Sequence, residues 1–205
     1  MTKLIIIQAA LLVFQIITYF GCERFQTRMH NVLSKFDQHI PFLPFTVIPY
    51  STWFPLIAVF PITLFYGDAS LYSIYMTAMF FDIVLSVIIY LIYPTTFERP
   101  TPPDTIMGKL MKAIYKGSYK GVNCAPSLHC SSCFMTIYFA IACSGMPMVL
   151  RAIYVVVAIL IILSTMTTKQ HAIIDVITAL PMAVVSILIG MALPAEFLLS
   201  YVGTI

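Results

Sequence analysis

The sequence predicts an all-α membrane protein in which six transmembrane helices pack into one bundle. Hydrophobic residues make up 60% of the 205 positions and charged residues only 9%, whereas soluble domains carry about 25% charged residues. Six apolar stretches each approach the roughly 20 residues that a spanning helix needs. The polar residues are too few to cover the surface of a soluble fold of this length, so lipid must be the main solvent.

The six predicted spans cover residues 4–20, 47–66, 70–92, 126–145, 148–165 and 171–194, and they form a single membrane domain over residues 1–205. The first ends at Gly21-Cys22, a pair that also occurs at lipoprotein cleavage sites. Its apolar run is long for a signal peptide, and Tyr19 and Phe20 are bulky where small residues are required, so we interpret it as a span. The second span contains three prolines, which kink or shorten a helix unless neighbouring helices compensate.

Two polar connections carry chemistry-bearing residues. Residues 23–45 have apolar positions at mixed helical spacing before two prolines, which predicts a short surface helix and an extended re-entry. The long polar loop 93–125 contains Lys109, Lys112 and Lys116 at helical spacing, opposite an apolar face, which predicts an amphipathic helix on the membrane surface. Contact with anionic headgroups and simple anchoring at the interface are both open interpretations of its lysines.

An even number of spans places the loops after the first, third and fifth spans on the same side of the membrane. Three polar segments then converge, at residues 97–100, 124–129 and 164–175. We therefore expect the catalytic half of the chain to cover residues 93–194.

The converging residues predict a phosphoryl-transfer site. Pro126 and Ser127 are typical of a helix start, where unpaired N–H groups favour an anion, and His129 follows in the first turn. His171 and Asp175 are four apart, so on a helix the carboxylate can accept from one imidazole nitrogen and leave the other free to attack.

Two cations complete this prediction. Arg99 and Lys169 supply positive charge for the phosphate oxygens. Taken singly, each histidine is more often a hydrogen-bonded interior residue, and Arg99 or Lys169 an interfacial anchor, so the prediction depends on their joint spacing.

These residues resemble the integral-membrane branch of the type 2 phosphatidic acid phosphatase and vanadium haloperoxidase superfamily. That family is marked by Lys-x6-Arg-Pro, Pro-Ser-x-His and Ser-Arg-x5-His-x3-Asp. This chain has Arg99-Pro100, then Pro126-Ser127-Leu128-His129, then Ser164 with His171 and Asp175 at the family spacing. The segment from Asp37 to Phe42 and the string Thr168-Lys169-Gln170-His171 are similar to the subgroup that includes inositol phosphorylceramide synthases.

Two positions depart from the family pattern. Ile92 stands where the family has its lysine, and Thr165 where it has an arginine. Lys169 is the expected replacement for the second cation. The candidates for the first are Lys109, Lys112, Lys116 and Lys120.

The resemblance implies specific roles. His171 would attack phosphorus, Asp175 would orient it, and His129 would protonate the departing oxygen. Arg99, Ser127, Ser164 and Lys169 would hold the phosphate, and no metal or cofactor would be needed. The expected function is removal of phosphate from a lipid phosphate or diphosphate through a phosphohistidine. The alternatives are a lipid headgroup phosphotransferase and a catalytically silent membrane protein of the same fold.

The expected partners are a lipid phosphate substrate and membrane lipids. The formal charge of +3 is small and dispersed, so no nucleic acid is expected. The sequence does not predict the oligomeric state. The five cysteines lie in or beside apolar stretches and are expected to be buried thiols. Asp82, deep in the third span, is expected to be a buried carboxyl bonded to a neighbouring helix.

Charge distribution also predicts an orientation. The face with the expected site carries nine basic residues and the other face two, Lys3 and Arg151, so the positive-inside rule favours a cytoplasmic site. The family resemblance instead implies an outer or lumenal site. The membrane itself is expected to be a cell inner membrane or an endomembrane.

Overall fold

The computed structural model describes residues 2–118, 121–193 and 199–201, and it is an all-α bundle with one very short pair of strands. In chain order the elements are α1 (Thr2–Cys22), β1 (His30–Asn31), the 3-10 turns η1 (Lys35–His39) and η2 (Pro44–Thr46), α2 (Val47–Ser51), α3 (Trp53–Gly67), α4 (Ala69–Ile92), β2 (Thr95–Thr96), α5 (Ile106–Gly117), α6 (Leu128–Ala142), α7 (Met148–Thr167) and α8 (Ile173–Ala192). The prediction of an all-α polytopic bundle is confirmed.

Within the described residues, five helical stretches are long and apolar enough to cross a membrane: Thr2–Cys22, Pro44–Gly67, Ala69–Ile92, Met148–Thr167 and Ile173–Ala192. The fourth predicted span is a shorter apolar helix of 15 residues, α6. It begins late because Ser127 caps it, accepting from the Cys130 N–H, and it ends before Gly145 and Pro147.

The second predicted span is divided into two helices. The break falls at Thr52, between α2 and α3. Pro55 has no N–H to donate to the preceding turn, so a continuous helix would lose a hydrogen bond there. Pro61 lies inside α3 and is accommodated by the bundle.

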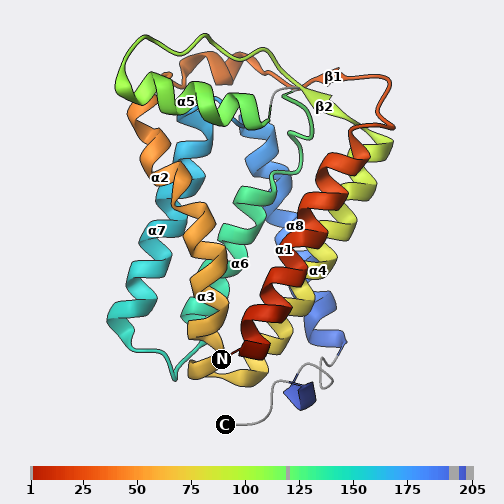
Figure 1. Ribbon diagram of the computed structural model, residues 1–205, viewed down its shortest axis with the longest axis vertical. Helices are drawn as coiled ribbons and strands as arrows, with labels where there is room; N and C mark the ends of the chain where they lie inside the picture. Colours follow the sequence, from red (N-terminus) through yellow and green to blue (C-terminus); the bar gives the residue numbers. More distant parts are fainter. Residues whose placement is uncertain (1, 119–120, 194–198, 202–205) are drawn as a thin grey trace.

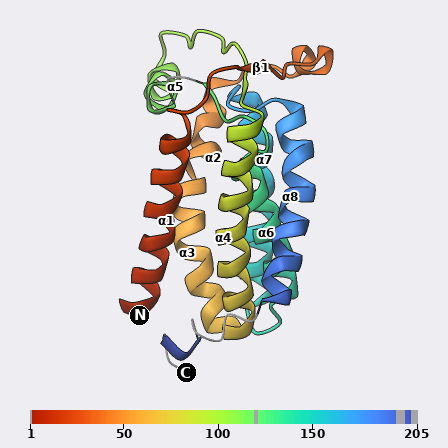
Figure 2. The same cartoon turned by 90° about the vertical axis from the view of Figure 1, so that its right-hand side faces the viewer.

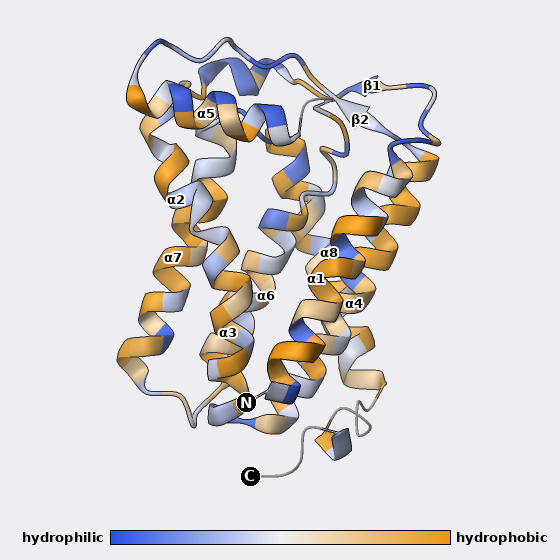
Figure 3. Cartoon of the chain, viewed as in Figure 1, coloured by the Kyte–Doolittle hydropathy of each residue, from blue (hydrophilic) through white to orange (hydrophobic). Residues whose placement is uncertain are grey.

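The helices run alongside one another, with α5, β1 and β2 across one end and the start of α1 at the other (Figure 1). Hydropathy colouring shows apolar residues along the helices and hydrophilic ones gathered at the α5 end (Figure 3). Large apolar side chains such as Ile17, Val149 and Leu188 point outward and are more than half exposed. This pattern is that of a bundle solvated by lipid.

A glycine on α8 allows this helix to pack closely on α4. A Cβ on Gly190 would lie 2.6 Å from the Ile74 carbonyl oxygen, so only glycine allows this contact. Asp82, on α4, is fully buried and its Oδ2 accepts from the Ser131 hydroxyl of α6 at 2.7 Å. The expectation of a buried carboxyl bonded to a neighbouring helix is confirmed.

The predicted surface helix in residues 23–45 is wrong. His30 and Asn31 pair in parallel with Thr95 and Thr96, and the helical part is only the 3-10 turn η1, which lies over the end of α8 (Figure 2). Ser34 and Asp37 form a reciprocal cap around that turn, and Pro41 prevents its extension into a longer helix.

Candidate active site

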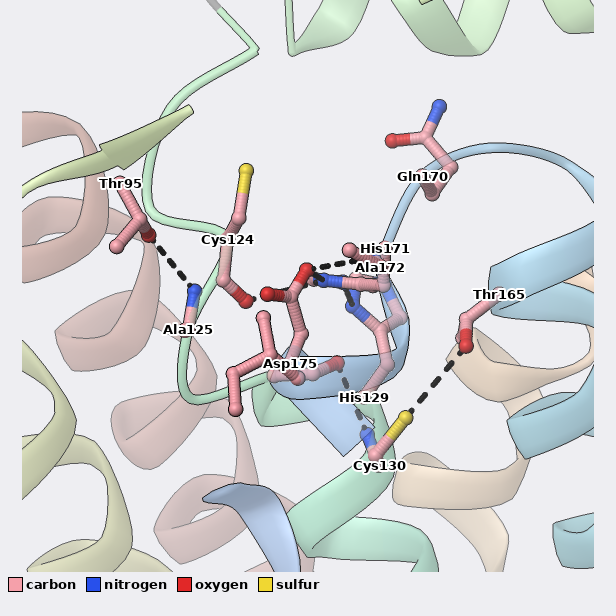
Figure 4. Close-up of polar contacts among 12 residues, drawn as sticks. Thr95, Cys124, Ala125, His129, Cys130, Thr165, Gln170, His171, Ala172 and Asp175 are labelled. Atoms are coloured by element: carbon pink, nitrogen blue, oxygen red, sulfur yellow. Dashed lines mark hydrogen bonds and ion pairs between the residues drawn. The ribbon is translucent and has the colours of Figure 1, made fainter. Parts of the chain in front are cut away.

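The three segments expected to converge do meet at the α5 end of the bundle. His129 lies in the first turn of α6, His171 in the connection between α7 and α8, and Arg99 in the loop after β2. Figure 4 shows the segments of His129 and His171 around Asp175 and the Cys124 carbonyl. The site is therefore built at helix ends, at the hydrophilic end of the bundle (Figure 3).

His171 is held in one orientation by two acceptors. Its Nδ1 lies 3.1 Å from Asp175 Oδ2 and 3.1 Å from the Cys124 carbonyl oxygen (Figure 4). A carbonyl oxygen can only accept, so Nδ1 carries the hydrogen, and in the neutral ring Nε2 carries the lone pair. Asp175 is fully buried, and its Oδ2 also accepts from the Ala172 N–H at 2.8 Å.

The free nitrogen of His171 faces the second histidine. His171 Nε2 lies 3.4 Å from His129 Nδ1. Because Nε2 has only a lone pair to offer, the hydrogen between the rings belongs to His129 Nδ1. A nucleophilic nitrogen and a proton donor thus point at the same small volume, as general acid catalysis of a displacement requires.

Two aromatic residues fix the His129 ring. The Tyr50 hydroxyl oxygen lies 3.1 Å from His129 Nε2, and its ring stacks on the imidazole at 5.0 Å. The Trp53 ring centroid lies 4.2 Å from that of His129, while its N–H donates to the Ser132 hydroxyl at 2.8 Å. The sequence analysis missed both residues. Their three-residue spacing gives a shared face, but no local pattern shows that this face packs on α6.

Arg99 reaches the site as expected, and one of its N–H groups has no hydrogen-bond partner among the described residues. Its Nη1 donates to the Ser118 hydroxyl at 2.9 Å and carbonyl at 3.1 Å, and its guanidinium lies 5.1 Å above the Tyr115 ring. Its buried Nε has no hydrogen-bond partner among the described residues. Gln170, which the sequence analysis did not select, lies in the same cavity, and its buried Nε2 likewise finds no partner there.

Three predicted phosphate ligands do not line the cavity. Ser127 is fully buried, caps α6 and donates its N–H to the Asp175 carbonyl at 3.2 Å. The Ser164 hydroxyl donates back to the Ile161 carbonyl at 2.7 Å inside α7. The Lys169 ammonium donates to the carbonyls of Asp37 at 3.0 Å and Ile40 at 2.7 Å. Arg99 and Gln170 line the cavity, whereas these three residues do not.

Burial and neighbouring groups shift the pKa values of three side chains beside the site. Burial raises the pKa of Asp37, but hydrogen bonds from Ser34 and the Ile173 N–H and the charge of Lys169 outweigh it and hold the pKa below its ordinary value. Burial lowers the pKa of Lys169, with the Asp37 carboxylate opposing the shift. Burial raises the pKa of the Cys124 thiol well above its ordinary value, so this thiol stays neutral and is no rival nucleophile.

A cavity of about 510 Å³ extends from the histidines into the bundle. Its polar end is lined by Arg99, Ser118, Asn123, His129, Gln170 and His171. Its apolar end is lined by residues of α1 and α3, among them Leu12, Ile16, Phe54 and Ile57. Ile16 and Phe54 are also 57% and 60% exposed, so the cavity reaches the lipid-facing surface between α1 and α3.

A protein-family model described as the PAP2 superfamily matches residues 23–189. The chain belongs to the PAP2 superfamily. PAP2 proteins generally have phosphatase activity on lipid phosphates, which agrees with a membrane bundle that holds a histidine pair at one face. Comparison with curated proteins finds no match, and comparison with solved structures finds none either. The PAP2 match begins after α1, so the helix that forms one wall of the cavity lies outside it.

Proposed function

We propose that this PAP2 protein removes phosphate from a lipid phosphate or diphosphate through a phosphohistidine formed on His171. The observation that carries the proposal is the pairing of the two rings, with the His171 Nε2 lone pair 3.4 Å from the His129 Nδ1 donor. Arg99 and Gln170 line the same cavity, and each has a donor, Arg99 Nε and Gln170 Nε2, without a partner among the described residues, which suits them to phosphate oxygens.

The geometry supports a two-step displacement. In the first step His171 Nε2 bonds to phosphorus, the bond from phosphorus to the lipid oxygen breaks, and His129 gives its Nδ1 proton to that oxygen. In the second step a water oxygen bonds to phosphorus, the phosphorus–nitrogen bond breaks, and His129 Nδ1 takes the water proton. Inorganic phosphate and a lipid alcohol leave, and both histidines return to their starting forms.

Tyr50 fits the acid form of His129. To give up its Nδ1 proton and end as a neutral ring, His129 would take up a proton when the anionic phosphate binds beside it, and its Nε2–H would then donate to the Tyr50 oxygen. The neutral ring then keeps its hydrogen on Nε2, so Nδ1 is free to act as the base toward water. The Tyr50 hydroxyl therefore supports both steps, because it accepts from His129 Nε2–H while Nδ1 first gives and then takes a proton.

The cavity supports a lipid substrate over a soluble phosphate ester. Its polar end holds the two histidines, while its apolar end runs between α1 and α3 to the lipid-facing surface. A hydrocarbon chain in this passage would remain in an apolar environment while the phosphate reached His171. Gln15 is among the α1 residues on this path.

The test is phosphate release by detergent-purified protein from phosphatidic acid, a polyprenyl diphosphate and a sphingolipid phosphate. We expect wild-type release that is abolished in His171→Ala and His129→Ala. The matched control is His39→Ala, since His39 is exposed on η1. Acid-labile label trapped on the wild-type protein by rapid quenching with a phosphate-labelled substrate, and absent from His171→Ala, would identify the phosphohistidine.

Other outcomes are informative. Release only when a lipid alcohol acceptor is added would indicate headgroup transfer, because the same phosphohistidine can pass to an alcohol instead of water. Loss of release in His39→Ala as well would point to misfolding. Absence of wild-type turnover under all these conditions contradicts the proposal and favours a silent fold, which the missing lysine at position 92 and arginine at position 165 would explain.

A further inference from the structure

The segment from residue 30 to residue 46, here called the strap, connects the loop of Arg99 to the loop of His171. At one end β1 pairs with β2, and the Val32 N–H donates to the Thr96 carbonyl at 3.1 Å. At the other end the Leu43 N–H donates to the Thr167 carbonyl at 2.9 Å. Figure 2 shows the η1 part of the strap passing over the end of α8.

Asp37 is the residue of the strap that binds the His171 loop through its side chain. Its Oδ1 accepts from the Ile173 N–H at 2.8 Å, two residues after His171. Its Oδ2 accepts from the N–H and hydroxyl of Ser34 at 2.8 and 2.6 Å, so the carboxylate is fixed within the strap. Asp37 is buried, with 4% of its surface exposed.

Lys169 binds the strap from the other side of His171. Its ammonium donates to the Asp37 and Ile40 carbonyls. Its backbone has a φ of +54°, a left-handed conformation that is unfavourable for a non-glycine residue. The contacts of its side chain with the strap offset this cost. The loop is thus held at positions 169 and 173, with His171 midway between them.

We propose that Asp37 is a positioning residue that, through the Ile173 N–H and the Lys169 side chain, holds the His171 loop in register with His129. The inference rests on the proposed nucleophilic role of His171. Asp37 does not line the cavity, and among the described residues its hydrogen bonds beyond the strap go to Lys169 and Ile173 rather than to either histidine, so it acts through the loop. The 3.4 Å separation of the two rings depends on where this loop lies.

The expected effect is on turnover rather than on substrate binding. A displacement of about 1 Å at a reacting group can cost roughly 100-fold in rate. We expect Asp37→Ala to lower kcat by about 100-fold and to leave KM within about twofold, since no cavity residue changes. Asp37→Asn keeps an oxygen for the Ile173 N–H and should retain more activity than Asp37→Ala. The control is Asp104→Ala, an exposed carboxylate on the same face paired with Lys112.

Hydrogen–deuterium exchange of the full chain in detergent micelles tests the positioning without any turnover. In Asp37→Ala, amides of residues 169–175 should exchange about tenfold faster, because local opening of this loop becomes easier, while α4 and α6 keep the wild-type pattern. Exchange unchanged in residues 169–175 would overturn the proposal even if turnover fell. Faster exchange throughout α4 and α6 would assign Asp37 a general structural role and would also overturn it.

The Lys169→Met variant separates the two connections between the strap and the loop, which are the Lys169 ammonium and the Asp37 carboxylate. It removes the ammonium but leaves the Asp37 bond to the Ile173 N–H, so its kcat should fall by less than that of Asp37→Ala. Since both residues hold one loop, the double variant should be little worse than Asp37→Ala alone, and strictly multiplicative losses would contradict a shared role. If wild-type protein shows no turnover, the proposed function fails and the exchange experiment still decides the role of Asp37.

Discussion

At the scale of single residues, the hydrogen bonds of each polar side chain decide whether it faces the histidine pair. His171 and Asp175, four apart at a helix start, do form the expected hydrogen bond, and His129 faces them. The directions of Ser164 and Lys169 could not be predicted. The Ser164 hydroxyl bonds to its own helix, and the left-handed backbone at Lys169 turns its side chain toward the strap. Such choices depend on tertiary acceptors that a linear pattern does not show.

We expect Asp175→Asn to reduce kcat, but by less than the replacement of an orienting carboxylate reduces kcat in a catalytic triad. In a catalytic triad the corresponding change costs about 10⁴-fold, because the imidazole takes the wrong tautomer. Here the Cys124 carbonyl also accepts from His171 Nδ1 and preserves the tautomer, so we expect a loss of roughly 100-fold to 1,000-fold. Steady-state phosphate release measures this. Asp68→Asn, which removes a helix-capping carboxylate at the start of α4, is the control. A loss as large as that of His171→Ala would contradict the role given to the Cys124 carbonyl.

At the scale of elements, long apolar runs predicted the spanning helices because lipid imposes their length. The prediction failed where contacts between distant segments decide the structure. Residues 30–46 form a strap rather than a surface helix because they bond to Thr96 and Thr167, far away in the chain. The aromatic clamp on His129 was missed for the same reason, since the packing of the second span on α6 cannot be read from either segment alone.

The wall that α1 contributes to the cavity should select the hydrocarbon part of the substrate. Leu12 lines the cavity, whereas its neighbour Val13 is 53% exposed on the lipid-facing side. Leu12→Trp narrows the apolar end, so we expect the KM for a long-chain lipid phosphate to rise about tenfold, with a smaller change for a short-chain one. Val13→Trp should leave both KM values unchanged. Equal effects of Leu12→Trp on both substrates would remove α1 from chain recognition.

At the scale of the whole molecule, the basic residues gather on the face that holds the histidines. Eight of the ten basic residues in the described part of the chain belong to connections on that face, and the eleventh basic residue, Lys120, lies outside the described residues. The positive-inside rule therefore predicts that this face is cytoplasmic. The opposite face exposes short connections such as that between α6 and α7, where Ser144 lies on the surface.

Cysteine labelling of intact cells tests this orientation. All five native cysteines are buried, so introduced thiols should dominate the signal. An impermeant maleimide added outside should label Ser144→Cys readily and label Lys112→Cys, on α5, only after the membrane is permeabilised. Ready labelling of Lys112→Cys in intact cells would place the histidine face outside or in a lumen, and the lysines of α5 would then serve anionic headgroups rather than topology.

The reacting groups and one wall of the cavity come from different parts of the sequence, because α1 lies before the segment that holds the histidines. The PAP2 match covers residues 23–189, which include both histidines, Asp175 and the strap, while the helix before it supplies Leu12 and Ile16 to the cavity. The bond-making groups and part of the surface that meets the hydrocarbon chain are therefore encoded in consecutive, non-overlapping stretches of sequence. A chimera that exchanges only the first 22 residues for another apolar helix would keep the chemistry and acquire a different preference among lipids.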